Sequence, residues 1–228
     1  MELHHAKINF LGDSITEGHG VQPEECFVSC FASKSGAICR NYGIGGTRIA
    51  QQRIPSEDPR WDLDFCQRVD QMDPDADVVV VFGGTNDFGH GDAPMGTMND
   101  RDTMSFYGAL HTLYTKLIAR FPTSLIVVAT PLHRICEDMP VSPSGRFFRH
   151  YPLHDYVCAI REVAEYYALP VLDLYAKSGM QPRVDIINQQ YFLDGLHPNS
   201  AGHKLLAEYM YSFLSHCPEK NRIIQTFC

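Results

Sequence analysis

Short apolar runs along the chain alternate with longer segments whose apolar positions recur at helical spacing. The clearest run is residues 77–82, where four consecutive valines favour a strand that is buried on both faces, as in a parallel sheet. Further strands are predicted at residues 6–11, 37–41, 124–130 and 169–172. The pattern thus predicts a sheet of four or five short strands.

The strongest helical pattern covers residues 103–121, where apolar side chains form one stripe at three- and four-residue intervals. The last helix is expected to begin at a cap formed by Asn199 or Ser200. Other helices are predicted at residues 24–35, 61–69 and 153–167. Because strands and helices alternate, we expect right-handed crossovers and a parallel sheet with helices on both faces.

No internal repeat or linker interrupts this pattern, so a single domain that covers residues 1–228 is predicted. Two irregular segments, residues 89–102 and 131–150, are longer than most loops of a compact domain. Loops of this length often carry function, which makes both segments candidates for shaping a binding site.

Composition is that of an ordinary globular protein, since 44% of the 228 residues are hydrophobic and 20% are charged. A net charge of −8 disfavours binding to the phosphates of nucleic acid. No signal-peptide pattern is visible, and the apolar runs are too short to cross a bilayer. We therefore expect a cytoplasmic protein with no nucleic-acid and no membrane partner. The eight cysteines include no CxxC pair and are expected to be structural or incidental thiols.

Polar and glycine-rich segments follow the predicted strands. In an open parallel sheet, ligands bind at the edge where the carboxyl ends of the strands meet. Four such segments lie at strand ends, and a fifth precedes the last helix. They are residues 12–14, 41–46, 83–87, 130–131 and 194–198.

Together these segments supply the groups that acyl transfer needs. The Ser14 hydroxyl is a candidate nucleophile, and His197 is a candidate base that would take its proton. Asp194 lies three residues before His197, a spacing that can return its carboxylate to the imidazole Nδ1 across a tight turn. The backbone N–H groups of Ser14 and Gly46 and the side-chain amide of Asn86 are candidate donors to an oxyanion.

Each of these features also has a purely structural interpretation. A Gly-Asp-Ser triplet is a common turn, and glycine-rich loops usually serve backbone geometry. Asn86 tolerates a left-handed turn conformation, and Asp194 could begin a helix. The catalytic interpretation therefore depends on all five segments meeting at one edge of the sheet.

A metal site has the weaker support. His197 and His203 lie six residues apart with Asp194 nearby, which is a sparse ligand set. The glycines of residues 43–46 lack the GxGxxG order and the lysine of a nucleotide-binding loop. We expect no metal and no cofactor.

Asp13, Arg48, Asp87 and His133 are candidate substrate-binding residues, because they lie in or beside the segments that would border the site. Residues 145–151 mix cations with aromatic side chains. They are expected to form a lid, a subunit contact or a cleft wall that receives a sugar ring or an anionic group. A small-molecule ester is the expected partner, and a homo-oligomer is left open.

The chain resembles the GDSL family of esterases and lipases, also called the SGNH hydrolases, along nearly its whole length. The resemblance is carried by four blocks in the family's order and near its spacing. These blocks are FLGDSIT at residues 10–16, NYGIGGT at 41–47, GGTND at 83–87 and DGLHP at 194–198.

The resemblance implies that Ser14 is the nucleophile, that Asp194 and His197 complete a triad, and that Gly46 and Asn86 belong to the oxyanion hole. It also implies a flavodoxin-like three-layer α/β/α sandwich, a metal-independent mechanism and an acyl-enzyme intermediate. The loops at residues 89–102 and 131–150 are not family signatures, so they leave the substrate open.

The leading hypothesis is a serine esterase that removes small acyl groups, such as acetyl, from a polar alcohol or a carbohydrate. It rests in part on the lack of a long apolar insertion that would line a tunnel for a fatty acyl chain. Two alternatives are a lysophospholipase or thioesterase acting on longer chains, and a binding protein on the same scaffold with a merely structural serine.

Overall fold

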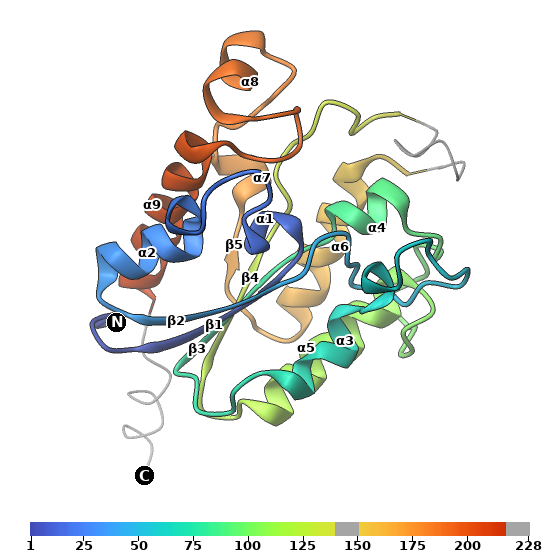
Figure 1. Cartoon of the computed structure of the whole chain (residues 1–228). Coiled ribbons are helices and arrows are strands. Elements are labelled where there is room, and N and C mark those ends of the chain that lie inside the picture. The colour runs from blue at the N-terminus through green and yellow to red at the C-terminus, as the bar shows by residue number, and fades with distance from the viewer. Residues whose placement is uncertain (140–150, 218–228) are drawn as a thin grey trace.

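The computed structural model describes residues 1–139 and 151–217. Its centre is a parallel sheet of five strands in the order β2-β1-β3-β4-β5 (Figure 1). The strands are β1 (Lys7–Gly12), β2 (Ile38–Gly43), β3 (Val78–Phe82), β4 (Leu125–Ala129) and β5 (Val171–Leu172). This arrangement confirms the predicted α/β fold with a parallel sheet of about five strands, and the strand order is that of flavodoxin-like folds.

Helices follow most strands. The α-helices are α1 (Ser14–Glu17), α2 (Phe27–Ser35), α3 (Phe65–Arg68), α4 (Thr85–His90), α5 (Phe106–Arg120), α6 (Leu153–Tyr166), α7 (Leu174–Lys177), α8 (Asp185–Tyr191) and α9 (Ser200–His216). Short 3₁₀ helices are η1 (Pro23–Glu25), η2 (Pro59–Asp62) and η3 (Val69–Gln71). None of the helices in the described ranges has the length and apolar character needed to cross a membrane.

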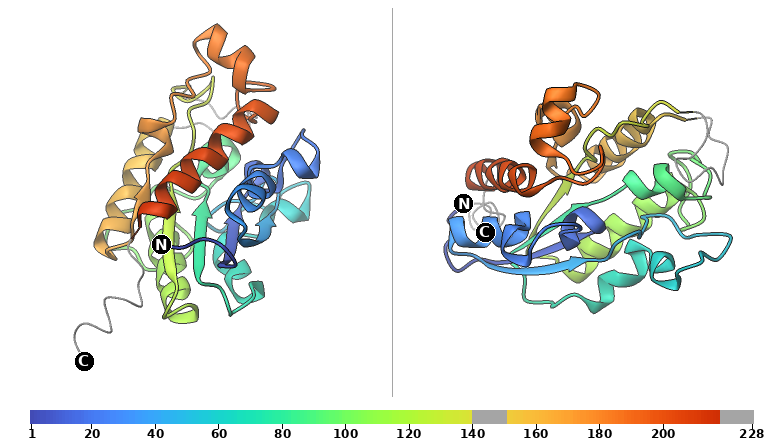
Figure 2. Two further views of the ribbon diagram at one scale, coloured as in Figure 1. Left: turned by 90° about the vertical axis from the view of Figure 1, so that its left-hand side faces the viewer. Right: turned by 45° about the horizontal axis from the view of Figure 1, so that its top comes forward.

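The two faces of the sheet are covered by different helices. Helices α2 and α9 lie on one face, and α3, α5 and α6 lie on the other (Figures 1 and 2). Side chains alternate between the faces along each strand, so Val79 and Val81 join the core beneath α5 while Val78 and Val80 join the core beneath α9. The valine run is therefore buried on both faces, as its continuous apolar character predicted.

The segment predicted as one helix at residues 61–69 is divided in two. Asp64 is extended (φ −61°, ψ 159°), and its carboxylate accepts the N–H of Gln67 as the cap of α3. This second cap separates η2 from α3 and leaves Trp61 on the partly exposed helix η2. The cap at Asp64 thus interrupts the single helix that the apolar spacing predicted.

The carboxyl ends of three strands are level with one another. Gly12 at the end of β1 pairs in register with Gly43 of β2 on one side and with Phe82 of β3 on the other. The loops that follow these three strands therefore leave the sheet side by side. They are the segments in which the sequence placed Ser14, Gly46 and Asn86.

Candidate active site

Ser14 is held at the turn from β1 into α1. Asp13 caps this helix, since its carboxylate accepts the N–H of Ile15 at 3.0 Å. Gly12 is required by a close approach: a Cβ on it would come 1.9 Å from the Thr16 Oγ1. The turn makes Ser14 the first residue of α1 and leaves it 7% exposed.

Three side chains predicted from the sequence lie in one hydrogen-bonded row. The Ser14 Oγ lies 3.1 Å from the His197 Nε2. The other ring nitrogen of His197, Nδ1, lies 2.7 Å from the Asp194 Oδ2. Ser14 and His197 are 183 residues apart in sequence, so it is the fold that brings them together. The row has the geometry of a nucleophile, a base and a group that orients the base.

The loop between α8 and α9 explains why a spacing of three residues brings the carboxylate to the imidazole. The Asp194 Oδ1 accepts the backbone N–H groups of Leu196 and His197, at 3.0 and 2.7 Å, which closes a tight turn. Burial opposes ionisation of Asp194. The hydrogen bonds from the His197 ring and from these two backbone N–H groups outweigh it and hold the pKa of Asp194 below its usual range. An anion therefore faces Nδ1, which favours the tautomer whose Nε2 can accept a proton.

The glycine loop after β2 passes beside Ser14. The Ile44 N–H donates to the Gly12 carbonyl at 3.2 Å, and a Cβ on Gly45 would lie 3.6 Å from the Ser14 Cβ. Gly46 follows with a φ of 76°. Within the described ranges, the N–H groups of Ser14 and Gly46 donate to no protein acceptor. Both are thus available to an oxyanion on a substrate.

Asn86 is the second residue of α4, directly after β3. Its Nδ2 donates to the Thr47 carbonyl at 3.0 Å, which fixes the amide against the loop that carries Gly46. An amide nitrogen has two hydrogens, so this bond leaves one for a ligand. The three candidate donors therefore lie just beyond the ends of three adjacent strands, β1, β2 and β3.

Arg68 ties these strand ends together, a role that the sequence did not indicate. Its buried guanidinium donates to the carbonyls of Tyr42 and Gly12, at 2.8 and 2.9 Å, and to the Thr47 Oγ1 at 3.0 Å. Burial lowers its pKa to about 10, against the opposing field of Asp13. One side chain thus fixes the ends of β1 and β2 and the start of the loop beyond Gly46.

Arg48, a candidate substrate-binding residue, makes its contacts within the protein, and its contact with a substrate stays a prediction. Its side chain is inside the protein, with the residue only 1% exposed. The guanidinium donates to the Asp62 Oδ1 at 2.8 Å, the Trp61 carbonyl at 2.8 Å and the Ser56 Oγ at 3.1 Å. Arg48 therefore fixes the segment around η2 from within.

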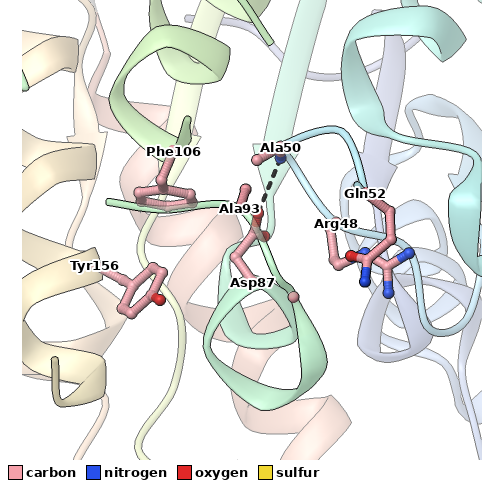
Figure 3. Close-up of a pocket in the computed structure, with 8 residues that line it drawn as sticks. Arg48, Ala50, Gln52, Asp87, Ala93, Phe106 and Tyr156 are labelled. Carbon is pink, nitrogen blue, oxygen red and sulfur yellow. Dashed lines mark hydrogen bonds between the residues drawn. The ribbon is translucent and has the colours of Figure 1, made fainter. Parts of the chain in front are cut away.

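Asp87 is likewise held by contacts within the protein, and its contact with a substrate stays a prediction. Its two carboxylate oxygens accept the backbone N–H groups of Ile49 and Ala50, each at 2.9 Å, and Figure 3 shows the bond to Ala50. Arg48 and Asp87 do line one small pocket, but its interior leaves no room even for a water molecule, so we do not place the substrate there. The other lining residues are Ala50, Gln52, Gly91, Ala93, Phe106 and Tyr156.

Asp13, the third of these candidates, is turned inward as the cap of α1 and is 2% exposed. Burial raises its pKa from 3.8 to about 7, although the Ile15 N–H and the charge of Arg68 act in the opposite direction. Between these two pH values the folded state binds a proton that the unfolded state does not. Stability that is complete at low pH is therefore lost as the pH rises towards 7, by about 1.4 kcal/mol per pH unit.

We expect Asp13→Asn to remove this part of the pH dependence, because asparagine caps helices as well as aspartate and does not ionise. Urea unfolding at pH 5 and at pH 8 measures it. The free energy of unfolding of the wild type should fall between these values by roughly 3 kcal/mol more than that of the variant. An equal fall in both proteins would show that Asp13 does not titrate as described.

His133, the last candidate, lies on the segment after β4. Its Nδ1 lies 2.7 Å from the Glu137 Oε2, and its ring centroid lies 3.8 Å from that of Tyr175. In the same segment, the Ile135 N–H donates to the Gly195 carbonyl at 3.0 Å, next to Asp194. His133 is therefore beside the loop that carries the histidine and aspartate, and its contact with a substrate stays a prediction.

The long loop at residues 131–150 is described only as far as residue 139, so most of the aromatic and cationic stretch at 145–151 lies outside the described residues. In the parts of the chain that the structure does describe, no cluster of three or more histidine, cysteine, aspartate or glutamate side chains could hold a metal ion.

Comparisons with known proteins identify the family. The model of the GDSL-like lipase/acylhydrolase family matches residues 10–205. A solved structure of a protein from Lactobacillus plantarum is 31% identical to this chain, with a TM-score of 0.79, and covers 95% of this chain and 100% of its own. A comparison with curated proteins found no significant match.

Two further solved structures share the fold at lower identity. An acetyl xylan esterase is 22% identical with a TM-score of 0.62, and the match covers 91% of this chain and 99% of the esterase. A lipase/acylhydrolase from Enterococcus faecalis is also 22% identical with a TM-score of 0.62, over 95% of this chain and 96% of its own.

Proposed function

Because the chain belongs to the GDSL-like lipase/acylhydrolase family, we propose that it is a serine esterase that cleaves small acyl esters of a polar alcohol or carbohydrate. The observation that carries this proposal is the hydrogen-bonded row from Ser14 through His197 to Asp194. A serine that served only the turn would need no imidazole at 3.1 Å from its oxygen.

In the first half of the reaction, the Ser14 Oγ attacks the carbonyl carbon of the ester while its proton passes to the His197 Nε2. The resulting imidazolium is stabilised by Asp194, whose carboxylate lies 2.7 Å from Nδ1. His197 then donates the proton to the leaving alkoxide, and the acyl group stays on Ser14. A water molecule repeats the sequence against the acyl-serine and releases the acid.

The negative charge that develops on the carbonyl oxygen is received by the N–H groups of Ser14 and Gly46 and by the Asn86 amide. These donors are fixed in advance by the Arg68 hydrogen bonds and by the bond from Asn86 to Thr47. Donors that are already oriented need no reorganisation as the charge forms, so they contribute strongly to stabilising the transition state.

Asn86→Ala is expected to lower kcat by about 10²- to 10³-fold with a smaller effect on KM, because one donor to the oxyanion is lost. Steady-state hydrolysis of p-nitrophenyl acetate measures it. Asn99→Ala, which changes an exposed asparagine in the loop after α4, is the matched control and should leave kcat unchanged. A kcat for Asn86→Ala within a few-fold of the wild type would remove Asn86 from the oxyanion hole.

The preference for small acyl groups is supported by the lack of a long apolar insertion and by the likeness in fold to an acetyl xylan esterase. A series of p-nitrophenyl esters from acetate to decanoate tests it. We expect kcat/KM to be highest for the shortest esters. A kcat/KM that rises beyond about eight carbons would instead favour the lysophospholipase or thioesterase alternative.

A further inference from the structure

Trp61, the single tryptophan of the chain, packs against the loop that carries the proposed oxyanion donor. A Cβ placed on Gly46 would come 2.3 Å from the Trp61 Cδ1 and 2.5 Å from its Nε1. The indole therefore covers Gly46 on the side where any other residue would carry its side chain. At 36% exposed, the ring also presents a free surface.

This ring is held from the protein interior. The buried Arg48 guanidinium donates to the Trp61 carbonyl and to the next side chain, Asp62, each at 2.8 Å. The His90 ring at the end of α4, whose Nδ1 lies 2.8 Å from the Arg48 Nη1, also lies 5.1 Å from the indole, centroid to centroid. Trp61 is thus anchored through its backbone while its side chain stays at the surface, as a residue that contacts a ligand requires.

The position of the indole relative to the reacting carbon follows from the chemistry of the intermediate. The tetrahedral carbon carries the Ser14 oxygen, the oxyanion, the leaving oxygen and the acyl chain. The oxyanion must face Gly46 and Asn86, and the leaving oxygen must face His197, which gives it a proton. The acyl chain takes the remaining direction, away from the imidazole.

Two pairs of rings lie near the site. The centroid of the His19 ring lies 4.4 Å from that of His197, whereas Trp61 contacts Gly46 and lies beside His90. The indole thus contacts an oxyanion donor, whereas the ring beside His197 is that of His19. An indole in contact with Gly46 can border the direction that is left for the acyl chain.

We propose that Trp61 limits the length of the acyl chain that the enzyme accepts. Its indole forms a wall that leaves room for an acetyl group and blocks a longer chain. This inference rests on the proposed function, since it names the specificity determinant of the same site. An indole is wide and rigid, so truncating it to a methyl group opens space for several methylenes. Each methylene that becomes buried is expected to improve kcat/KM by about fourfold.

The test compares kcat/KM for p-nitrophenyl acetate and p-nitrophenyl hexanoate in the wild type and in Trp61→Ala. We expect the hexanoate-to-acetate ratio to rise by about 15- to 60-fold, from two or three newly accommodated methylenes. Trp61→Leu, which is narrower than tryptophan but fills part of the space, should give a smaller rise and serves if the alanine variant is poorly folded. Tyr166→Ala removes an exposed aromatic ring at the last residue of α6, the end from which the chain enters β5, and should leave the ratio unchanged.

The outcomes separate this inference from the proposed function. If the wild type hydrolyses esters through Ser14 and the ratio is the same in the wild type, Trp61→Ala and Trp61→Leu, the assignment of Trp61 is wrong and the esterase proposal stands. If the wild type hydrolyses no ester in the series, the proposed function fails and this inference fails with it.

Discussion

Replacement of Ser14 by alanine is expected to lower kcat by about 10⁴- to 10⁶-fold, the range for loss of a nucleophile that acts as a unit with its base. The change deletes one oxygen and keeps the Cβ. The hydroxyl makes its hydrogen bond to the His197 Nε2, so its loss removes the attacking atom and disturbs no other side chain with which it is paired. Substrate binding should therefore survive, and KM should change far less than kcat.

Hydrolysis of p-nitrophenyl acetate by purified Ser14→Ala measures this effect, with thermal unfolding to show that the variant is folded. Ser29→Ala is the matched control, because it removes a serine hydroxyl of α2 that donates to the Pro23 carbonyl of η1 and to none of the three side chains of the row. The control should retain the wild-type kcat. A Ser14→Ala variant that keeps a tenth or more of the wild-type rate would exclude Ser14 as the nucleophile.

Asp194→Asn is the second large effect, with an expected loss in kcat of about 10⁴-fold at neutral pH. The Asp194 Oδ1 accepts two backbone N–H groups, so the carbonyl oxygen of asparagine takes that position and the amide nitrogen faces His197. An amide nitrogen donates, and it therefore selects the tautomer whose Nδ1 is unprotonated. The proton then sits on Nε2, where His197 can no longer accept one from Ser14.

Because the backbone hydrogen bonds of the turn are kept in Asp194→Asn, the loop should retain its shape and the loss should fall on kcat. Steady-state kinetics at pH 7 tests this. Asp185→Asn, which alters an exposed carboxylate on the neighbouring helix α8, should behave as the wild type. A loss of less than about tenfold in Asp194→Asn would contradict the assigned role of the carboxylate.

Much of the fold followed from local pattern. The valine run, the stripe along α5 and the cap at Asn199 each mark one element, and α9 does begin directly after Asn199, whose side chain accepts the N–H groups of Ala201 and Gly202. The short helices α4 and α8 were missed, because one or two turns carry too little apolar periodicity to distinguish them from loops.

The sequence predicted that Ser14, His197 and Asp194 come together, because their segments were expected to meet at one edge of the sheet. Three of the predicted substrate contacts stay predictions, and the structure shows a competing structural role for each. Asp13, Arg48 and Asp87 are charged, and charged residues at strand ends resemble groups that face a ligand. In the folded chain they are buried and satisfied by donors or acceptors that sequence pattern does not show.

Arg68 and Trp61 were missed for the complementary reason. Nothing in the local sequence distinguishes Arg68 from an exposed helical arginine, and its three hydrogen-bond acceptors lie 21 to 56 residues away. Trp61 was placed in a longer helix, whereas the cap at Asp64 leaves it on a separate turn beside Gly46. Both roles depend on long-range contacts that only the assembled sheet edge creates.

Labelling with a fluorophosphonate reagent tests the central claim most directly, because such a reagent forms a covalent bond with a serine only where a base activates it. The modified protein would be digested and its peptides identified by mass spectrometry. We expect one adduct on Ser14, absent from Ser14→Ala and from heat-unfolded protein. No adduct on Ser14 in the folded protein would contradict it and would favour a binding protein with a structural serine.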